Sequence, residues 1–183
     1  MTKKHNYFYT ISLLVIVATL FSVYASDKDV DKIKACVDFN PKIVVCGKSF
    51  VSQTRMHNAI RTWEKVGYSF EEIVYLDEDS CIDYNEYGTI IISKPKDDFD
   101  YNYLAVTKRF TIKILEQDYI LYSKIYIPRK ELRKERVLEH EIGHALGWDH
   151  FDSTYHIMHE NWGLGGNKMF GLDKNIYDKK CVQ

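Results

Sequence analysis

The sequence contains few residues that interrupt a fold and no large excess of charge of either sign. Three of its 183 residues are proline, and it has no internal repeat and no low-complexity tract. Nothing therefore marks an internal linker, and this length is enough for one domain but short for two. The 25 basic and 26 acidic residues give a net charge of -1. No long-range field attracts nucleic acid or an anionic membrane, so we expect no nucleic-acid partner.

Residues 1–25 differ from the rest of the chain. Two lysines precede the uncharged apolar run ISLLVIVATLF, and the small residues of SVYA follow it. This order is typical of a secretory signal peptide cleaved after Ala25, and it predicts a secreted protein or one of the cell envelope, in the periplasm or at the surface. The alternative is an uncleaved N-terminal anchor, because the apolar segment approaches the ~18–20 residues that span a bilayer. Only that alternative brings the protein to a membrane. We expect residues 26–183 to form a single domain.

Four cysteines follow this segment: Cys36, Cys46, Cys81 and Cys181. An even number of cysteines in an exported protein predicts two disulfides, and four buried thiols are the alternative. The sequence does not choose among the three pairings. Cys36–Cys46 is the short-loop option, and it would leave Cys81–Cys181 to hold the C-terminal tail.

The hydrophobic pattern predicts several strands and two main helices, which together indicate an α/β or α+β fold. The expected strands are apolar or alternating runs at residues 42–50, 71–77, 88–94, 104–116 and 119–128. The first helix is expected to start at Ser52, which can cap it, and to end at Gly67. Its apolar face consists of Met56, Ala59, Ile60, Trp63 and Val66.

A second helix is expected from about Lys130 to Leu146, and a short C-terminal helix at residues 172–180. The apolar stripe of the second helix consists of Leu138, Ile142, Ala145 and Leu146. Gly147 is placed to end this helix. Its first part contains the basic run RKELRKER, residues 129–136. Because glutamates are interspersed with the cations, we interpret this run as a solvated helix face and not as a nucleic-acid site.

The stretch HEIGHALGWDH contains three histidines and a glutamate. His140 and His144 are four residues apart, so a helix would point both imidazoles at one metal ion. Gly147 tolerates positive φ, and the turn that it permits can bring His150 back as a third nitrogen ligand. Three protein ligands leave one position for water, which is the arrangement of catalytic zinc. Glu141 would lie beside the metal and act as a general base on that water.

This stretch is similar to the extended zinc signature of the metzincin metallopeptidases. In the downstream sequence YHIMHE, Met158 stands where these enzymes have their Met-turn, and the two motifs together most resemble the matrixin, or matrix metalloproteinase-like, branch. The resemblance implies an α+β fold with a twisted, mostly parallel five-stranded sheet, an antiparallel edge strand, a zinc-binding helix and a C-terminal helix. It also implies a hydrophobic floor at Met158. Substrate would bind extended along the edge strand, which we expect within residues 104–116.

The function that the resemblance implies is that of a secreted zinc endopeptidase acting on a protein or peptide. His140, His144 and His150 would hold one Zn²⁺, and Glu141 would activate water and pass its proton to the leaving amine. An inhibitory thiolate at Cys36 is an alternative to a disulfide at that residue.

Some residues depart from the matrixin pattern. Phe151 follows the third histidine where matrixins usually have Ser, and His159 and Glu160 follow Met158 where they usually have Tyr and Pro. These departures leave the subfamily and the shape of the specificity pocket open. Trp162 and the glycine-rich run after it are candidates for the wall of that pocket.

Two other functions stay open. One is a zinc-bearing protein-binding module in which cleavage is dispensable, and the other is a structural zinc protein with His159 or Asp152 as a fourth ligand. The acidic segment 77–86 is a candidate for Ca²⁺ but is more typical of a solvated loop, so calcium has no further support. We interpret His57, His156 and His159 as surface residues.

Overall fold

The computed structural model describes residues 32–47, 50–95 and 99–181. The expected signal peptide or anchor, residues 1–25, lies outside the described residues. Among the helices of the described part of the chain, none is both long enough and apolar enough to cross a membrane.

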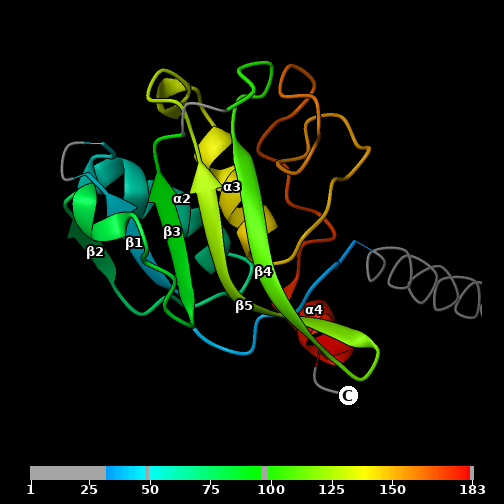
Figure 1. The fold of residues 1–183 in the computed structure, drawn as a ribbon. Coiled ribbons are helices and arrows are strands. Elements are labelled where there is room, and N and C mark those ends of the chain that lie inside the picture. The colour runs from blue at the N-terminus through cyan, green and yellow to red at the C-terminus, as the bar shows by residue number, and fades with distance from the viewer. Residues whose placement is uncertain (1–31, 48–49, 96–98, 182–183) are drawn as a thin grey trace, which may run out of the picture.

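Five strands form one sheet in the spatial order β2-β1-β3-β5-β4 (Figure 1). The strands are β1 (Lys42–Cys46), β2 (Ile73–Leu76), β3 (Thr89–Ser93), β4 (Val106–Ile114) and β5 (Gln117–Tyr126). β1 pairs in parallel with β2 and β3, and β3 pairs in parallel with β5. β4 is antiparallel to β5 and lies at the edge of the sheet. The predicted α+β class, with a mostly parallel five-stranded sheet and an antiparallel edge strand, is confirmed.

The inner strands β1 and β3 are apolar on both faces. The three consecutive isoleucines of β3 are buried, as are the last four residues of β1. One face belongs to the main core under the helices, and the other is covered by a smaller cluster that includes Val44 and Ile91. Continuous apolar runs are typical of parallel strands covered on both faces, which explains why these segments do not alternate.

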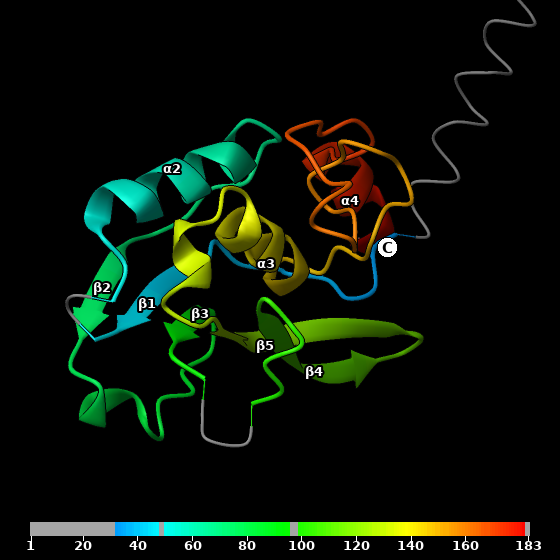
Figure 2. The same ribbon diagram turned by 90° about the horizontal axis from the view of Figure 1, so that it is seen from above.

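Helices α2 (Gln53–Glu64) and α3 (Val137–Ala145) lie side by side over one face of the sheet (Figure 2). The first helix starts as predicted, because the Ser52 hydroxyl accepts a hydrogen bond from the backbone N–H of Arg55 at 3.2 Å. The Arg55 guanidinium and the Glu139 carboxylate form a two-pronged ion pair at 2.5 and 2.6 Å between the two helices. The short C-terminal helix α4 (Lys174–Cys181) is also confirmed.

The second predicted helix begins later than expected. Residues Glu131–Arg133 form a separate 3₁₀ turn (η2), Arg136 has φ 72°, and α3 starts only at Val137. The prediction of one helix from Lys130 was therefore wrong at its start, and so was the interpretation of RKELRKER as a solvated helix face. The reason is tertiary packing, because the first two residues of the turn, one of them acidic, are buried. The apolar stripe of the helix itself is buried as predicted.

Two disulfides join Cys36 to Cys181 and Cys46 to Cys81. The short-loop option, Cys36–Cys46, is not formed. Cys36 lies against the start of β5, and the end of α4, with Cys181, reaches the same place. Cys46 is the last residue of β1 and lies beside the 3₁₀ turn η1 (Asp79–Cys81), which contains Cys81. The first disulfide ties the two ends of the described chain together, and both point to an oxidising compartment.

Loss of the Cys36–Cys181 disulfide should destabilise the protein more than loss of Cys46–Cys81. The bridges close loops with sequence separations of 145 and 35 residues. Constraining the larger loop removes more entropy from the unfolded chain, so we expect Cys36→Ser/Cys181→Ser to cost about 2–5 kcal/mol and the other pair about 1 kcal/mol less. Urea denaturation of both double variants measures this, and an equal or reversed order would contradict the prediction.

Candidate metal centre

The three histidines come from α3 and from the turn that follows it. His140 and His144 lie one helical turn apart on α3. Gly147 then adopts φ 99°, and a Cβ at this position would lie 1.9 Å from the carbonyl oxygen of Ala35. Only glycine therefore fits this turn, both for its φ and for the close approach of the N-terminal segment. The turn returns the chain toward the helix and brings His150 beside the other two rings.

The three Nε2 atoms converge on one point. His144 Nε2 lies 2.9 Å from His140 Nε2 and 3.1 Å from His150 Nε2. Nitrogen ligands of a tetrahedral zinc ion, at ~2.0–2.1 Å from the metal, would be about 3.3 Å apart. These three form the one group of metal-binding side chains found among the described residues. The predicted ligand set is therefore brought together, and it could hold a metal ion, consistent with zinc.

Backbone carbonyl groups orient the two helical rings. Nδ1 of His140 lies 2.9 Å from the Ile157 oxygen, and Nδ1 of His144 lies 2.9 Å from the Trp148 oxygen. A carbonyl oxygen only accepts, so each Nδ1 donates its hydrogen and each Nε2 keeps a free lone pair for a metal. Burial lowers the pKa of His140 to about 4 and that of His144 to about 3. Both rings are therefore neutral at neutral pH, which is the state that binds metal.

His150 is the accessible member of the group. Its side chain is 38% exposed, and its Nδ1 lies 3.8 Å from the Glu160 carboxylate. It therefore closes the outer side of the centre, while the two helical rings form the inner side.

A close contact behind the histidines joins α3 to the predicted floor residue Met158. Met158 is fully buried, and a Cβ on Gly143 would lie 2.4 Å from its sulfur and 2.4 Å from Cζ2 of Trp63. A larger residue at Gly143 would push the helix away from both side chains. Gly143 is not among the residues predicted from the sequence, although a glycine between two candidate ligands inside a helix is the signal that could have found it.

Glu141 lies on the side of α3 that faces the edge strand. It is buried, and its Oε2 accepts a hydrogen bond from the Thr107 hydroxyl of β4 at 2.6 Å. Burial raises the pKa of the Glu141 carboxyl to about 7, and the Thr107 hydrogen bond acts in the opposite direction. The pKa of this carboxyl group is therefore close to the value that suits a general base at neutral pH. Thr107 is not among the residues predicted from the sequence, because it has no local signal and reaches Glu141 only through the tertiary fold.

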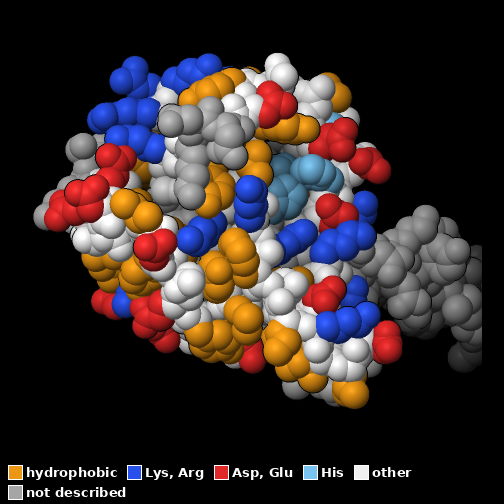
Figure 3. Space-filling model, in the orientation of Figure 1, with side chains coloured by type: hydrophobic (Ala, Val, Ile, Leu, Met, Phe, Trp, Pro, Cys, Tyr) orange, Lys and Arg blue, Asp and Glu red, His pale blue; other side chains and the backbone are white. Residues whose placement is uncertain are grey.

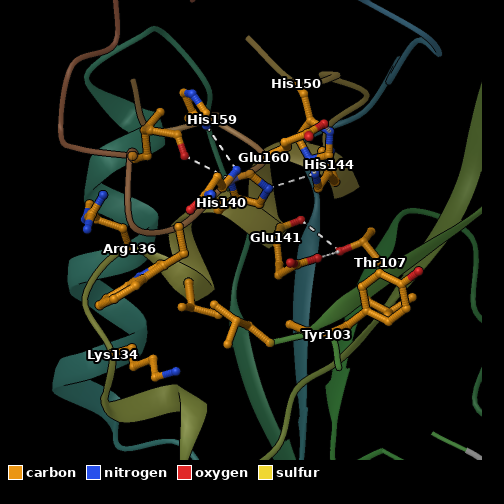
Figure 4. Close-up of a pocket in the computed structure, with 18 of the residues that line it drawn as sticks. Tyr103, Thr107, Lys134, Arg136, His140, Glu141, His144, His150, His159 and Glu160 are labelled. Carbon is orange, nitrogen blue, oxygen red and sulfur yellow. Dashed lines mark hydrogen bonds and ion pairs between the residues drawn. The ribbon is translucent and has the colours of Figure 1, made fainter. Parts of the chain in front are cut away.

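The histidines line a cleft of about 790 Å³. One side is formed by residues 102–107, which include the start of β4, and the other by the loop after Met158, with Trp162 among its residues. Figure 3 shows histidine side chains exposed in a hollow of this face. In Figure 4, Tyr103 and Thr107 lie on one side of the cluster and Lys134 and Arg136 on the other. The predicted edge strand thus borders the cleft, and the loop of Trp162 forms its opposite wall.

The remaining candidate residues have different positions. His156 is fully buried, so its interpretation as a surface residue was wrong: it stacks on Phe151 and its Nε2 lies 3.0 Å from the Phe170 oxygen. His57 is exposed as predicted. His159 lines the cleft, but neither it nor Asp152 joins the metal-binding group of the described residues.

Removal of the accessible histidine should abolish tight metal binding without unfolding the protein. We expect the parent chain to bind one equivalent of Zn²⁺ and His150→Ala to bind it at least about 100-fold more weakly. Loss of a hydrogen bond that orients a metal ligand lowers metal affinity ~10–100-fold, and loss of the ligand itself should lower it more. Chelator competition and elemental analysis measure this. His159→Ala is the matched control, and weaker binding in the control with unchanged binding in His150→Ala would refute the assignment.

No family model matches the chain, and no curated protein matches it either. The function therefore has to be inferred from the chemistry of the centre and its cleft.

Proposed function

We propose that the protein is a zinc-dependent endopeptidase of the metzincin type, most similar to the matrixin branch, and that it acts outside the cytoplasm. The observation that carries this proposal is the three-histidine cluster at the base of an open cleft, with a buried carboxyl group beside it. The two disulfides support an extracellular or envelope location. The zinc signature, the Met158 contact and the edge strand support the family.

His140, His144 and His150 would hold the zinc ion. When bound, zinc supplies a Lewis acid that lowers the pKa of water and polarises a carbonyl group. The neutral rings and their converging Nε2 atoms suit this ion, and the described residues provide no fourth donor. An open coordination position favours a catalytic site over the structural alternative.

Glu141 is the general base of the proposed reaction. Its carboxylate takes a proton from the attacking water and then gives it to the leaving amine. The Thr107 hydrogen bond occupies Oε2 and leaves Oε1 for this transfer. A buried, oriented carboxylate has no evident use in a module that only binds proteins, so its presence favours an enzyme.

The edge strand supports an extended substrate. β4 pairs with β5 on one side, and no strand of the described chain pairs with its other side. Leu104 and Thr107 line the cleft at the start of this free edge. A peptide can therefore add to the sheet through backbone hydrogen bonds and pass directly over Glu141.

Glu141→Gln should keep the metal and lose turnover. The amide cannot take a proton, so we expect kcat on a peptide library to fall by about 10²–10⁴-fold, the usual contribution of a general base. Fluorogenic peptide cleavage with and without chelator measures this, and metal content is the control. A variant that cleaves as fast as its parent would remove Glu141 from the mechanism.

Thr107→Val should lower kcat and leave KM nearly unchanged. Valine keeps the branched shape that suits the strand but cannot hold the Glu141 carboxylate, and a hydrogen bond to a charged group is worth ~1.5–3 kcal/mol, so we expect a loss of about 10–100-fold. Thr107→Ser retains the hydroxyl and should recover most of the rate. Equal rates for the valine and serine variants would show that the hydroxyl has no positioning role.

A further inference from the structure

Three cations line the cleft, and they differ in what they contact. The Arg109 guanidinium donates to the carbonyl oxygen of His144 at 3.2 Å. The Lys134 ammonium meets the Glu131 carboxylate at 2.7 Å. Among the described residues, neither arginine has a carboxylate oxygen within 4.0 Å of its guanidinium. Arg136 differs from Arg109 because no hydrogen bond of its guanidinium is found there, whereas Arg109 Nη1 also lies 3.5 Å from the Trp148 carbonyl oxygen. In the described part of the chain, Arg136 is therefore the cation of the cleft for which neither an ion pair nor a side-chain hydrogen bond is found.

The Arg136 side chain is held in place by its surroundings. Its guanidinium carbon lies 5.4 Å from the centroid of the Trp162 ring. The indole N–H of Trp162 donates to the backbone carbonyl oxygen of Glu135 at 2.9 Å. On another side, a Cβ on Gly165 would lie 2.9 Å from its Nη1. The guanidinium thus packs against an indole and a glycine backbone, which restrict its motion without using its N–H groups.

The backbone of Arg136 is also unusual. With φ 72° it occupies the left-handed region, which is unfavourable for a side chain of this size. Its carbonyl oxygen accepts the hydrogen bond from the backbone N–H of His140 at 2.8 Å. Arg136 therefore stands one helical turn before the first metal ligand, about 5–6 Å along the axis.

The acidic groups that line the cleft lie next to groups other than Arg136. Glu141 accepts from the Thr107 hydroxyl at 2.6 Å, Asp149 lies 3.4 Å from the Lys34 ammonium, and Glu160 lies 3.8 Å from the His150 ring. None of them is within ion-pair distance of Arg136. An anion that enters the cleft from solvent therefore meets an unneutralised guanidinium in a partly desolvated site.

We propose that Arg136 determines specificity by pairing with a carboxylate of the substrate next to the scissile bond. This inference rests on the proposed peptidase function. A planar guanidinium pairs with a carboxylate in two-pronged geometry, which favours Glu or Asp over a neutral residue. The Trp162 ring at its side restricts the motion of the guanidinium. The carboxylate can belong to an acidic side chain or to the end of a peptide, and these two sources give different results below.

The test uses amidated fluorogenic peptides that carry Glu or Gln, in turn, at each position on both sides of the cleaved bond. We expect Glu to raise kcat/KM about tenfold or more over Gln at one position beside the bond, as for a buried charge-assisted pair. Arg136→Gln should remove this preference and leave cleavage of the Gln peptide within about threefold of the parent. Arg136→Glu should reverse it, so that Lys is preferred at the same position.

Arg133→Gln is the matched control, because Arg133 is an exposed cation three residues earlier that does not line the cleft. It should keep the Glu preference. A second set of peptides carries a free C-terminal carboxylate at the sensitive position. If this carboxylate raises kcat/KM in the parent chain but not in Arg136→Gln, the terminal carboxylate is the source. The proposal is overturned if the parent chain prefers neither Glu nor a free C-terminal carboxylate. It is also overturned if Arg136→Gln keeps the preference with an unchanged melting temperature.

Binding separates this proposal from the peptidase function. Fluorescence polarisation of the same peptides with zinc-loaded Glu141→Gln should show tighter binding of the Glu peptide, about tenfold, and loss of the difference when Arg136→Gln is added. If the parent chain cleaves no peptide but this difference is present, the peptidase function fails and the recognition of a carboxylate stands. Equal affinity for the Glu and Gln peptides rules out the role of Arg136 in either case.

Discussion

The approach of three imidazole nitrogens to one point is the constraint on which the rest of the structure depends. Rings this close, with Nε2 atoms 2.9 and 3.1 Å apart, have to be neutral and have to direct their lone pairs at the same place. Burial keeps the two helical rings neutral, and backbone oxygens fix which nitrogen carries the hydrogen. The helix, the turn at Gly147 and the segment around Ile157 must therefore all be in place before the centre exists.

The layers behind the centre supply that rigidity. Met158 and Trp63 pack against α3 at Gly143, and the Arg55–Glu139 ion pair joins α3 to α2. On the other side of the helix, the segment before β1 packs closely enough against Gly147 to exclude any side chain there. The Cys36–Cys181 disulfide ties this same segment to α4. The metal centre is thus held by contacts between parts of the chain that are far apart in sequence.

The two walls of the cleft have different tasks in the proposed enzyme. On the β4 wall, the Thr107 hydroxyl is bonded to the Glu141 carboxylate. No strand of the described chain pairs with the outer edge of β4, so this edge suits any extended peptide. The opposite wall holds Arg136 against Trp162, and among the described residues no hydrogen bond of its guanidinium is found. Reactivity would therefore depend on the first wall and choice of substrate on the second. Such a division allows specificity to change without disturbing the reacting groups.

The sequence by itself determined the parts that depend on local spacing. The four-residue interval between His140 and His144, the glycine that ends the helix and the apolar runs of the strands are short-range patterns, so the ligand set, the first helix and the strands could be predicted. The mostly parallel sheet and its antiparallel edge strand were expected only from the resemblance to a known family, and the order of the strands was not predicted, because pairing between distant strands has no local signal.

Only the tertiary structure decided which distant groups meet. The cysteine pairing, the start of α3 at Val137, the burial of His156 and the contacts of Thr107 and Arg136 all depend on packing between segments far apart in the chain. The same residues in sequence are compatible with several arrangements, because periodicity describes one element at a time. Packing selects one arrangement by the apolar area that it buries and the polar groups that it satisfies.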